Sequence, residues 1–486
     1  MADLVSKLSD ERQIIERFRL RCLSPDDGKY GDTSENLIEY LSPEAEWKEC
    51  ANLHKVLLET RMEFGEAEQW NVDEVKKALE KIDPLNMALM EKTSPEEGGT
   101  RHDQLAVIEE IGRYISLETK ALLHPGTTSY DIIDTIRPYL FKKAWKEKIR
   151  PIIISDVEKL CDLGERSISL IQVGRTHLQD TSPVTFGGVL ASYAARIAKR
   201  VERLDLYFND LKGKISGIVG TGAGIEMVIG KGKAMEFEKA VLKKLGLKPD
   251  YTSTQIVQKE GLSDVGHGFV SLMHVHADFA DDIRKMYSSS IKEVTSRSNS
   301  ARLGGSSSDA GKDNPIDLEN IGGTEPIVES GMRLLYFMIQ SDFQRDLKNS
   351  KPASYQPQLM MAEVYETFVR LNKILPDLSV NEDRLAQNLL YVRNSPSDAM
   401  GNILKGEKFL HPVHGDPHTF VKEVGKKSKK SGRKLLDVAL EDIEFARAYE
   451  NLSEDKRAIL GGKLELYIGD AIKRAEMNID YAKSVN

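Results

Sequence analysis

The 486-residue chain has only three cysteines, Cys22, Cys50 and Cys161, which lie far apart and form no Cys-x-x-Cys pair. A disulfide framework needs more cysteines than this, and a structural zinc site needs them closely spaced. The scarcity therefore excludes both classes of protein. We expect reduced thiols and a cytoplasmic location.

Long hydrophobic runs are also missing. No stretch of 18 apolar residues occurs, and no apolar signal segment follows Met1. A membrane-spanning helix needs about 20 apolar residues and a secretory signal a shorter apolar core. We therefore expect neither secretion nor a membrane partner.

Metal-ligand spacings are absent from the ten histidines, none of which forms a His-Glu-x-x-His pattern. His274 and His276 are two residues apart, which on a helix places them on different faces. We predict that the protein uses no metal and no cofactor.

The charge balance is slightly acidic, with 68 Lys and Arg against 76 Asp and Glu and a net charge of −8. A general nucleic-acid binder would be basic, so no nucleic-acid partner is expected. The one strongly basic stretch, Lys426 to Lys434, is interpreted as a solvated loop rather than a nucleic-acid patch. A histidine-rich segment, His411 to His418, receives no functional assignment.

Strand signals are few, whereas helical periodicity is strong. The clearest helix covers residues 186–211, in which apolar residues recur every three or four positions. These are Leu190, Tyr193, Ile197, Val201, Leu204, Phe208 and Leu211. Residues 267–294 repeat the pattern through Val270, Met273, Ala277, Ala280, Ile283 and Tyr287. Further helices are predicted over residues 44–64, 134–163 and 331–339 and from near His102.

Long helices with one apolar stripe predict an all-α fold built on an extended central bundle. A long bundle exposes much side surface, so we expect it to pack against copies of the same chain. We predict three parts: an N-terminal helical domain (1–122), the central bundle (123–372) and a C-terminal helical domain (373–486).

The glycine- and serine-rich segment Gly304 to Pro315 cannot form a core. Three glycines, three serines, Lys312 and Asn314 suit a mobile lid, placed at residues 303–316, that closes over an anion. The same composition also fits a flexible surface linker.

Three polar segments stand before predicted helices. His177 lies in Gly174 to Gln179, a loop where it can transfer protons or simply cap the following helix. His102 lies in Thr100 to Asp103, and is either a polar catalytic group or surface filler. The third segment, His124 to Asp131, offers hydroxyl and N–H groups to a carboxylate or phosphate, or only a helix cap.

Together these segments resemble the aspartase/fumarase superfamily, whose lid signature is Gly-Ser-Ser-x-Met-Pro-x-Lys-x-Asn-Pro. Gly305, Ser306, Ser307, Lys312, Asn314 and Pro315 match it. Asp309 and Ala310 replace the methionine and proline.

Further segments resemble the adenylosuccinate lyase family in particular. These are Ser24 to Tyr30, Thr100 to Asp103, Thr128 to Thr135, Arg175 to Gln179, Ser253 to Gln255 and Gln344 to Ser350. Lys29 replaces a family arginine, and a later Glu-Arg pair has no clear counterpart near Lys351 to Tyr355.

The resemblance implies an all-α, three-domain fold that tetramerises through the central bundle, with sites shared between subunits. It implies β-elimination of fumarate from a succinylated nucleotide, adenylosuccinate, and from the related succinylcarboxamide ribotide of purine synthesis. Ser307 would be the general base and His177 the general acid, with His102 and Lys312 in support. Substrate would be held by Lys29, Tyr30, Arg101, Thr128, Ser129, Thr176, Gln255, Ser306, Asn314, Arg345 and Ser350.

Three alternatives remain open. The chain could act on a substrate with another leaving group, as argininosuccinate lyase does. It could also be a carboxymuconate cycloisomerase. The chain could also be a non-catalytic homolog, because the Asp309 carboxylate near Ser307 opposes both alkoxide formation and a dianionic ligand.

Overall fold

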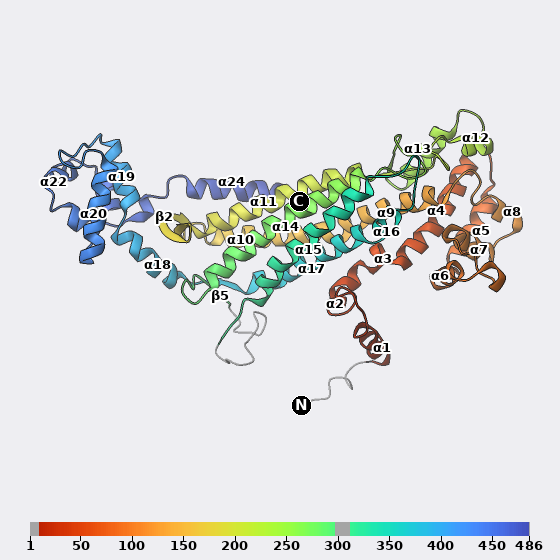
Figure 1. Cartoon of the computed structure of the whole chain (residues 1–486), viewed down its shortest axis with the longest axis horizontal. Coiled ribbons are helices and arrows are strands. Elements are labelled where there is room, and N and C mark those ends of the chain that lie inside the picture. The colour runs from red at the N-terminus through yellow and green to blue at the C-terminus, as the bar shows by residue number, and fades with distance from the viewer. Residues whose placement is uncertain (1–8, 297–311, 486) are drawn as a thin grey trace. The chain divides into compact units, whose positions relative to one another are not determined.

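The computed structural model describes residues 9–296 and 312–485, and its regular secondary structure is almost entirely helical (Figure 1). The predicted all-α class is confirmed. Three small two-stranded sheets are the only sheets within the described ranges. In the same ranges, no helix combines the length and hydrophobicity needed to cross a bilayer.

The chain forms two compact units, each built from three separate segments. Unit 1 comprises residues 1–153, 200–274 and 323–370, and unit 2 comprises residues 154–199, 275–322 and 371–486. The borders fall within or at the start of five long helices, which therefore contribute to both units. These are α10 (Arg150–Arg166), α11 (Phe186–Asp210), α14 (Glu260–Tyr287), α15 (Ile316–Met338) and α17 (Gln356–Ile374). The three-domain division by sequence stays a prediction, as does the tetramer.

Unit 1 otherwise consists of helices and one short parallel strand pair. They are α1 (Asp10–Arg19), α2 (Gly31–Ser34), η2 (Glu35–Leu37), α3 (Ile38–Leu41), α4 (Pro43–Glu63), α5 (Gln69–Leu79), α6 (Pro84–Lys92), η3 (Pro95–Glu97), α7 (Asp103–Gly112), α8 (Leu117–Ala121), α9 (Ser129–Ala144), η4 (Trp145–Ile149), β3 (Lys212–Gly213), α12 (Ala223–Ile229), α13 (Ala234–Lys244), β4 (Lys248–Pro249) and α16 (Ser350–Ala353).

Unit 2 adds two antiparallel strand pairs and a C-terminal group of helices. They are β1 (Ile171–Thr176), β2 (Gln179–Thr185), β5 (Val294–Ser296), η5 (Leu375–Asp377), β6 (Leu378–Val380), α18 (Glu382–Asn394), α19 (Ser397–Gly406), α20 (Pro417–Ser431), α21 (Leu435–Ala439), α22 (Ile443–Glu450), α23 (Glu454–Leu460), η6 (Leu464–Leu466) and α24 (Ala471–Ser484).

The stripe predicted for α11 is buried as expected, since all seven of its apolar residues are less than 9% exposed. Burying such a stripe is the main driving force for long helices to pack together. For α14 the prediction was partly wrong, because the helix covers Glu260–Tyr287 rather than residues 267–294. Three residues of the predicted stripe, Val270, Ala277 and Tyr287, are only half-buried. The buried face instead runs through Val265, Phe269, Leu272, His276, Phe279 and Ile283.

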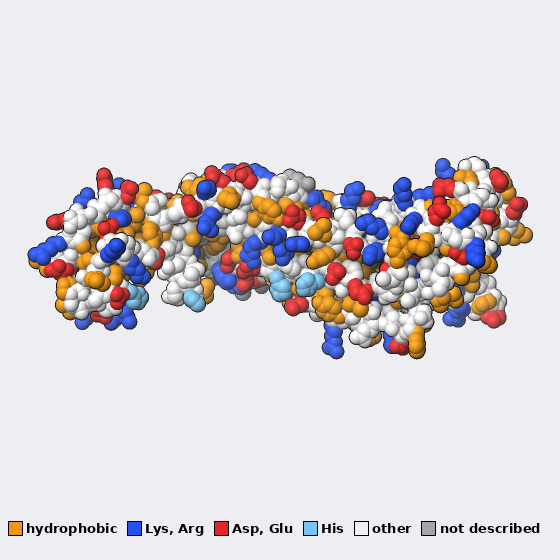
Figure 2. All heavy atoms as spheres, turned by 90° about the horizontal axis from the view of Figure 1, so that it is seen from above, with side chains coloured by type: hydrophobic (Ala, Val, Ile, Leu, Met, Phe, Trp, Pro, Cys, Tyr) orange, Lys and Arg blue, Asp and Glu red, His pale blue; other side chains and the backbone are white. Residues whose placement is uncertain are grey.

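Two other expectations were wrong. Gly174 to Gln179 does not lie in a loop before a helix but belongs to the β1–β2 hairpin. A Cβ on Gly174 would collide with the Ser182 carbonyl oxygen, so this bulged position requires glycine. The basic stretch beginning at Lys426 is not a loop at its start, because α20 continues to Ser431 and ends at Gly432 in the left-handed conformation. On the face seen in Figure 2, charges of both signs are interspersed.

Candidate active site

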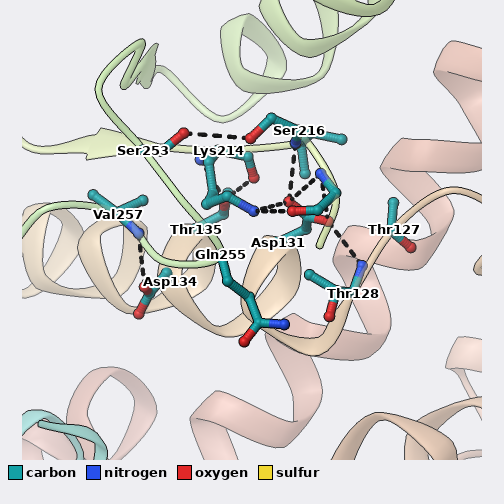
Figure 3. Close-up of polar contacts among 12 residues, drawn as sticks. Thr127, Thr128, Asp131, Asp134, Thr135, Lys214, Ser216, Ser253, Gln255 and Val257 are labelled. Atoms are coloured by element: carbon teal, nitrogen blue, oxygen red, sulfur yellow. Dashed lines mark hydrogen bonds and ion pairs between the residues drawn. The ribbon is translucent and has the colours of Figure 1, made fainter. Parts of the chain in front are cut away.

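The start of α9 carries a dense network of polar contacts (Figure 3). Thr128 is the N-cap residue and Asp131 completes a capping box, with Thr128 N–H donating to Asp131 Oδ2 at 2.8 Å. The helix cap expected from the sequence is therefore present. The N–H groups of Ser129 and Tyr130, in the first turn, have no acceptor inside the helix.

Asp131 also organises the chain opposite α9. It forms a fully buried ion pair with Lys214 and accepts hydrogen bonds from Ser216 N–H and Gly217 N–H at 3.0 and 3.2 Å. Thr135 Oγ donates to the Lys214 carbonyl at 2.8 Å. A buried ion pair is retained only when hydrogen bonds satisfy both partners, as these do. Segment 214–217 is thus fixed against the first turns of α9.

A second cluster joins residues that are up to 220 positions apart. The Arg345 guanidinium lies 3.6 Å from the centroid of the Tyr130 ring, and Arg345 Nη1 donates to Gln255 Oε1 at 3.0 Å. The Tyr130 hydroxyl donates to Ser350 Oγ at 2.9 Å. Because Tyr130 is in the first turn of α9, the structure brings Gln255, Arg345 and Ser350 to the helix end that carries Thr128 and Ser129.

This cluster has unused capacity to bind an anion. The Nε group of Arg345 is buried and has no hydrogen-bond partner among the described residues. The positive end of the α9 dipole and the free N–H groups of its first turn add to the positive potential. A buried donor without a partner is unfavourable, so a carboxylate or phosphate at this position would satisfy it.

His102 is the N-cap residue of α7, where its Nδ1 accepts from Leu105 N–H at 3.4 Å and lies 3.2 Å from Asp103 Oδ1. The expected helix start near His102 is confirmed. Its imidazole is exposed and is close enough to His124 to influence that residue's pKa.

His124 is a functional candidate that the sequence argument passed over. Burial lowers the pKa of His124, Asp131 opposes this shift, and Arg61 and His102 add to it. Its Nδ1 lies 3.0 Å from Thr127 Oγ. His124 therefore stays neutral at pH 7 and can accept a proton. Its position in the same polar segment as Thr128 was the signal that could have found it.

Arg61 supports the segment that carries His124. This buried guanidinium donates to the carbonyl oxygens of Leu122 and, at 2.5 Å, Pro125. Burial lowers the pKa of Arg61 to about 10, so it remains charged at neutral pH. Two bonds from one rigid, planar group fix the backbone that leads into Thr128.

The remaining predicted residues of unit 1 lie in other surroundings. The Lys29 ammonium is 5.3 Å from the Tyr30 ring centroid, and the Arg370 guanidinium of α17 is 5.6 Å from the same ring. Arg101 is exposed and has a φ of 50°, just before His102. Among the described residues, Lys29, Tyr30 and Arg101 form no hydrogen bond or ring contact with the Tyr130 cluster.

In unit 2, His177 stands at the tip of the β1–β2 hairpin, next to Thr176. Thr176 pairs with Gln179, so His177 and Leu178 form a two-residue turn with φ values of 54° and 58°. Such turns normally use Asn-Gly, because positive φ strains residues that have a Cβ. Strain of this kind is concentrated at functional sites. The hairpin presents the His177 imidazole to solvent.

The hairpin is anchored by a buried glutamate. Glu293 accepts from Arg175 Nη1 and Nη2 at 2.8 and 2.6 Å, from Gln172 at 2.7 Å and from Asn388 at 2.8 Å. Burial alone would raise the pKa of Glu293, but these hydrogen bonds outweigh it and lower the pKa. The Arg175 guanidinium therefore serves to anchor the hairpin through Glu293.

Lys312 and Asn314 lie just before α15 in unit 2, where Lys312 is exposed and Asn314 is half-buried. Ser306 and Ser307, and most of the expected lid at 303–316, lie outside the described residues. The only possible metal cluster within the described ranges is His274, Glu325 and Glu329. Because His274 is 55% exposed and pairs with Glu325 at 3.2 Å, we interpret it as a surface ion pair. His276 is buried, which confirms that the two histidines face different ways.

The fold is similar to those of solved protein structures. The chain aligns with a 3-carboxy-cis,cis-muconate lactonizing enzyme from Pseudomonas putida at a TM-score of 0.78 and 18% identity, covering 93% of this chain and 97% of the other. A fumarate lyase from Mesorhizobium sp. BNC1 gives 0.76 and 19%, with 92% and 97% covered. These likenesses show that the chain has the same all-α fold as these two proteins.

Sequence comparison narrows the class to a family. Residues 43–325 match the family described as lyase, and the chain belongs to that family. It is 28% identical to the adenylosuccinate lyase of Pyrococcus abyssi, over 90% of this chain and 95% of that one. It is also 28% identical to the adenylosuccinate lyase of Pyrococcus horikoshii, over 95% and 98%. The resemblance inferred from the motifs is thereby confirmed, and with it the prediction of a lyase.

Proposed function

We propose that this lyase cleaves adenylosuccinate to AMP and fumarate and cleaves the related succinylcarboxamide ribotide in the same way. The full-length similarity to adenylosuccinate lyases supports the substrate class. The observation that carries the proposal is the Arg345–Tyr130–Gln255 cluster at the start of α9, whose buried Arg345 Nε is unpartnered among the described residues. A succinyl group carries two carboxylates that can use such a site.

The reaction starts with loss of a proton from the carbon next to one carboxylate. That carboxylate takes up the negative charge as an aci-carboxylate, and the electron pair then expels the nitrogen from the neighbouring carbon. The product is fumarate, and the amine takes up a proton. Preorganised donors lower the barrier most where the charge develops. Arg345, the α9 N–H groups, Lys312 and Asn314 supply these donors in our proposal.

Ser307 acts as the proposed base and His177 as the proposed acid. A serine becomes basic only if neighbouring cations and exclusion of water favour its alkoxide, which Lys312 and a closed lid would provide. An imidazole at the strained tip of a hairpin is accessible to a substrate, as proton transfer to the leaving nitrogen requires. His102 and the neutral His124 orient the substrate.

The first test measures fumarate release by the purified protein from adenylosuccinate, the succinylcarboxamide ribotide, argininosuccinate and aspartate. We expect turnover of the two nucleotides alone. Fumarate release from argininosuccinate alone would contradict the proposed substrate and indicate an argininosuccinate lyase. A folded oligomer that turns over neither nucleotide would contradict the proposal. Turnover of 3-carboxymuconate instead would indicate a cycloisomerase.

The second test uses two variants with a control. Arg345→Met should raise KM for adenylosuccinate about tenfold or more, because it removes a charge-assisted contact. Lys81→Met is the control: it removes one exposed positive charge elsewhere in unit 1 and should leave KM for adenylosuccinate unchanged. His177→Ala should lower kcat by two to four powers of ten, roughly the contribution of a general acid. Near-normal kcat in His177→Ala would remove the acid role.

A further inference from the structure

Unit 2 contains a cleft of about 640 Å³ that the proposed reaction does not use. Its walls come from β2, from the segment joining α18 to α19, and from one face of α20. A volume of this size lies within the range of sites for small organic ligands. The cleft is concave and is built wholly from residues of one compact unit.

One wall is cationic. Lys422, Lys426 and Lys429 line the cleft from a single face of α20, at the i, i+4 and i+7 positions. Lys426 is paired with Glu423 at 2.6 Å, whereas Lys422 and Lys429 have no ion pair among the described residues. Two unpaired ammonium groups on one face favour a ligand with at least two negative charges.

Other parts of the lining offer hydroxyl groups. Thr181, Ser395 and Ser397 line the cleft, and within the described chain their hydroxyls have no hydrogen-bond partner. Serine and threonine hydroxyls and lysine ammonium groups can all donate hydrogen bonds to phosphate oxygens. Apolar surface from Val421 and Leu464, together with the Tyr391 ring, completes the lining and suits a planar ring.

The acids of the cleft are already engaged. Asp398 accepts from Ser182 Oγ at 2.5 Å, from the Tyr467 hydroxyl at 3.1 Å and from Asn402 at 3.0 Å. Asp180 lies 3.2 Å from Arg175 Nε. Since each carboxylate already has at least one donor, its repulsion of an incoming anion is reduced.

We propose that this cleft is a binding site for a small phosphate monoester that carries a planar ring. The phosphate lies between Lys422, Lys429 and the hydroxyls of Thr181 and Ser397, and the ring lies against Val421 and Tyr391. The site is independent of the proposed lyase reaction. Because β2 follows the His177 turn directly, a bound ligand also restrains the hairpin.

The test is titration of the full-length protein with 1-naphthyl phosphate, followed by calorimetry. Inorganic phosphate lacks the ring and 1-naphthol lacks the charge, so both should bind at least about tenfold more weakly. Hydrogen exchange at residues 179–185 should slow when the monoester is bound. Absence of binding, or equal binding of 1-naphthol, would overturn the proposal.

Variants locate the site. Lys422→Gln with Lys429→Gln should weaken binding about tenfold or more. Lys427→Gln with Lys430→Gln removes the same charge from exposed positions of α20 that do not line the cleft, and should leave binding unchanged. If the two pairs weaken binding equally, the helix attracts anions without a built site and the proposal is wrong.

A third variant fills the cleft without removing charge. Gly425 lines the cleft within α20, and a Cβ placed there meets no atom within 4 Å. Gly425→Leu should therefore fold, since leucine also favours a helix, and it should abolish binding. If Arg345→Met abolishes binding and Gly425→Leu does not, the probe occupies the candidate active site. That result overturns this proposal and leaves the proposed function standing.

Discussion

At the scale of single residues, Glu293 shows how a buried charge is maintained. Its carboxylate is fully buried yet ionised, because Arg175, Gln172 and Asn388 all donate to it. Removing one partner of a buried pair costs more than the pair itself contributes, because the other charge stays buried. Arg175 and the hairpin that holds His177 both depend on this glutamate.

We expect Glu293→Gln to lower the free energy of unfolding by about 3 kcal/mol at pH 7. The folded-state pKa of Glu293 lies below the unfolded value of about 4.3. Its stabilisation is therefore complete above that pH and is lost as pH falls through the lower, folded pKa. Thermal unfolding of both proteins between pH 3 and 7 should show the difference shrinking in acid.

Glu407→Gln is the matched control, because Glu407 pairs with Lys456 on the surface of unit 2 with both side chains 40% exposed. Surface pairs contribute little to stability, so its melting temperature should follow that of the unmodified protein. A constant difference across the whole pH range for Glu293→Gln would contradict the charged network.

At the scale of elements, the turn that exposes His177 lowers the stability of the β1–β2 hairpin. Each L-residue in the left-handed region costs roughly 1–2 kcal/mol, and this turn contains two, His177 and Leu178. Leu178 is 73% exposed, so its side chain returns little through burial.

Leu178→Gly should therefore raise the melting temperature, by an amount equivalent to about 1 kcal/mol. Leu178→Ala keeps the strained backbone and should not. Differential scanning fluorimetry of the two variants provides the comparison. Equal melting temperatures would mean that residue 178 does not hold a positive φ in solution.

The elements that the sequence predicted correctly have strong local periodicity. The stripe of α11 repeats over 25 residues, and only one helix face can bury it. The hairpin has no such signal: its turn is His-Leu rather than Asn-Gly, and its strands contain Gly174 and Pro183. In α20, the density of lysines suggested a loop, but Phe420, Val421 and Val424 provide a buried face.

At the scale of the whole molecule, two residues of the proposed mechanism belong to different units: His177 to unit 2 and Arg345 to unit 1. In the proposed homotetramer, sites shared between subunits would combine such residues from different copies. If sites are shared between subunits, two inactive variants can recover activity when they assemble into one oligomer.

We expect mixing of His177→Ala and Ser307→Ala protomers, after dissociation and reassembly, to recover roughly a quarter of the normal fumarate release, since random assembly leaves that fraction of sites with both residues intact. Each variant reassembled alone should stay inactive. Size-exclusion chromatography with light scattering establishes the oligomeric state first. No recovery from a correctly reassembled tetramer would place both residues on one subunit.

The sequence by itself determined the helical class, the positions of α4 and α11 and the motifs that assign the chain to its family. It could do so because periodicity and motif order are local properties of the chain. Only the tertiary structure decided that Arg345, Gln255 and Ser350 meet at the first turn of α9, and that Arg175 holds a hairpin. It also revealed the buried Lys214–Asp131 ion pair at the start of α9 and the burial that lowers the pKa of His124. Contacts between residues tens to hundreds of positions apart follow from how helices pack, and packing depends on the whole set of side chains at once.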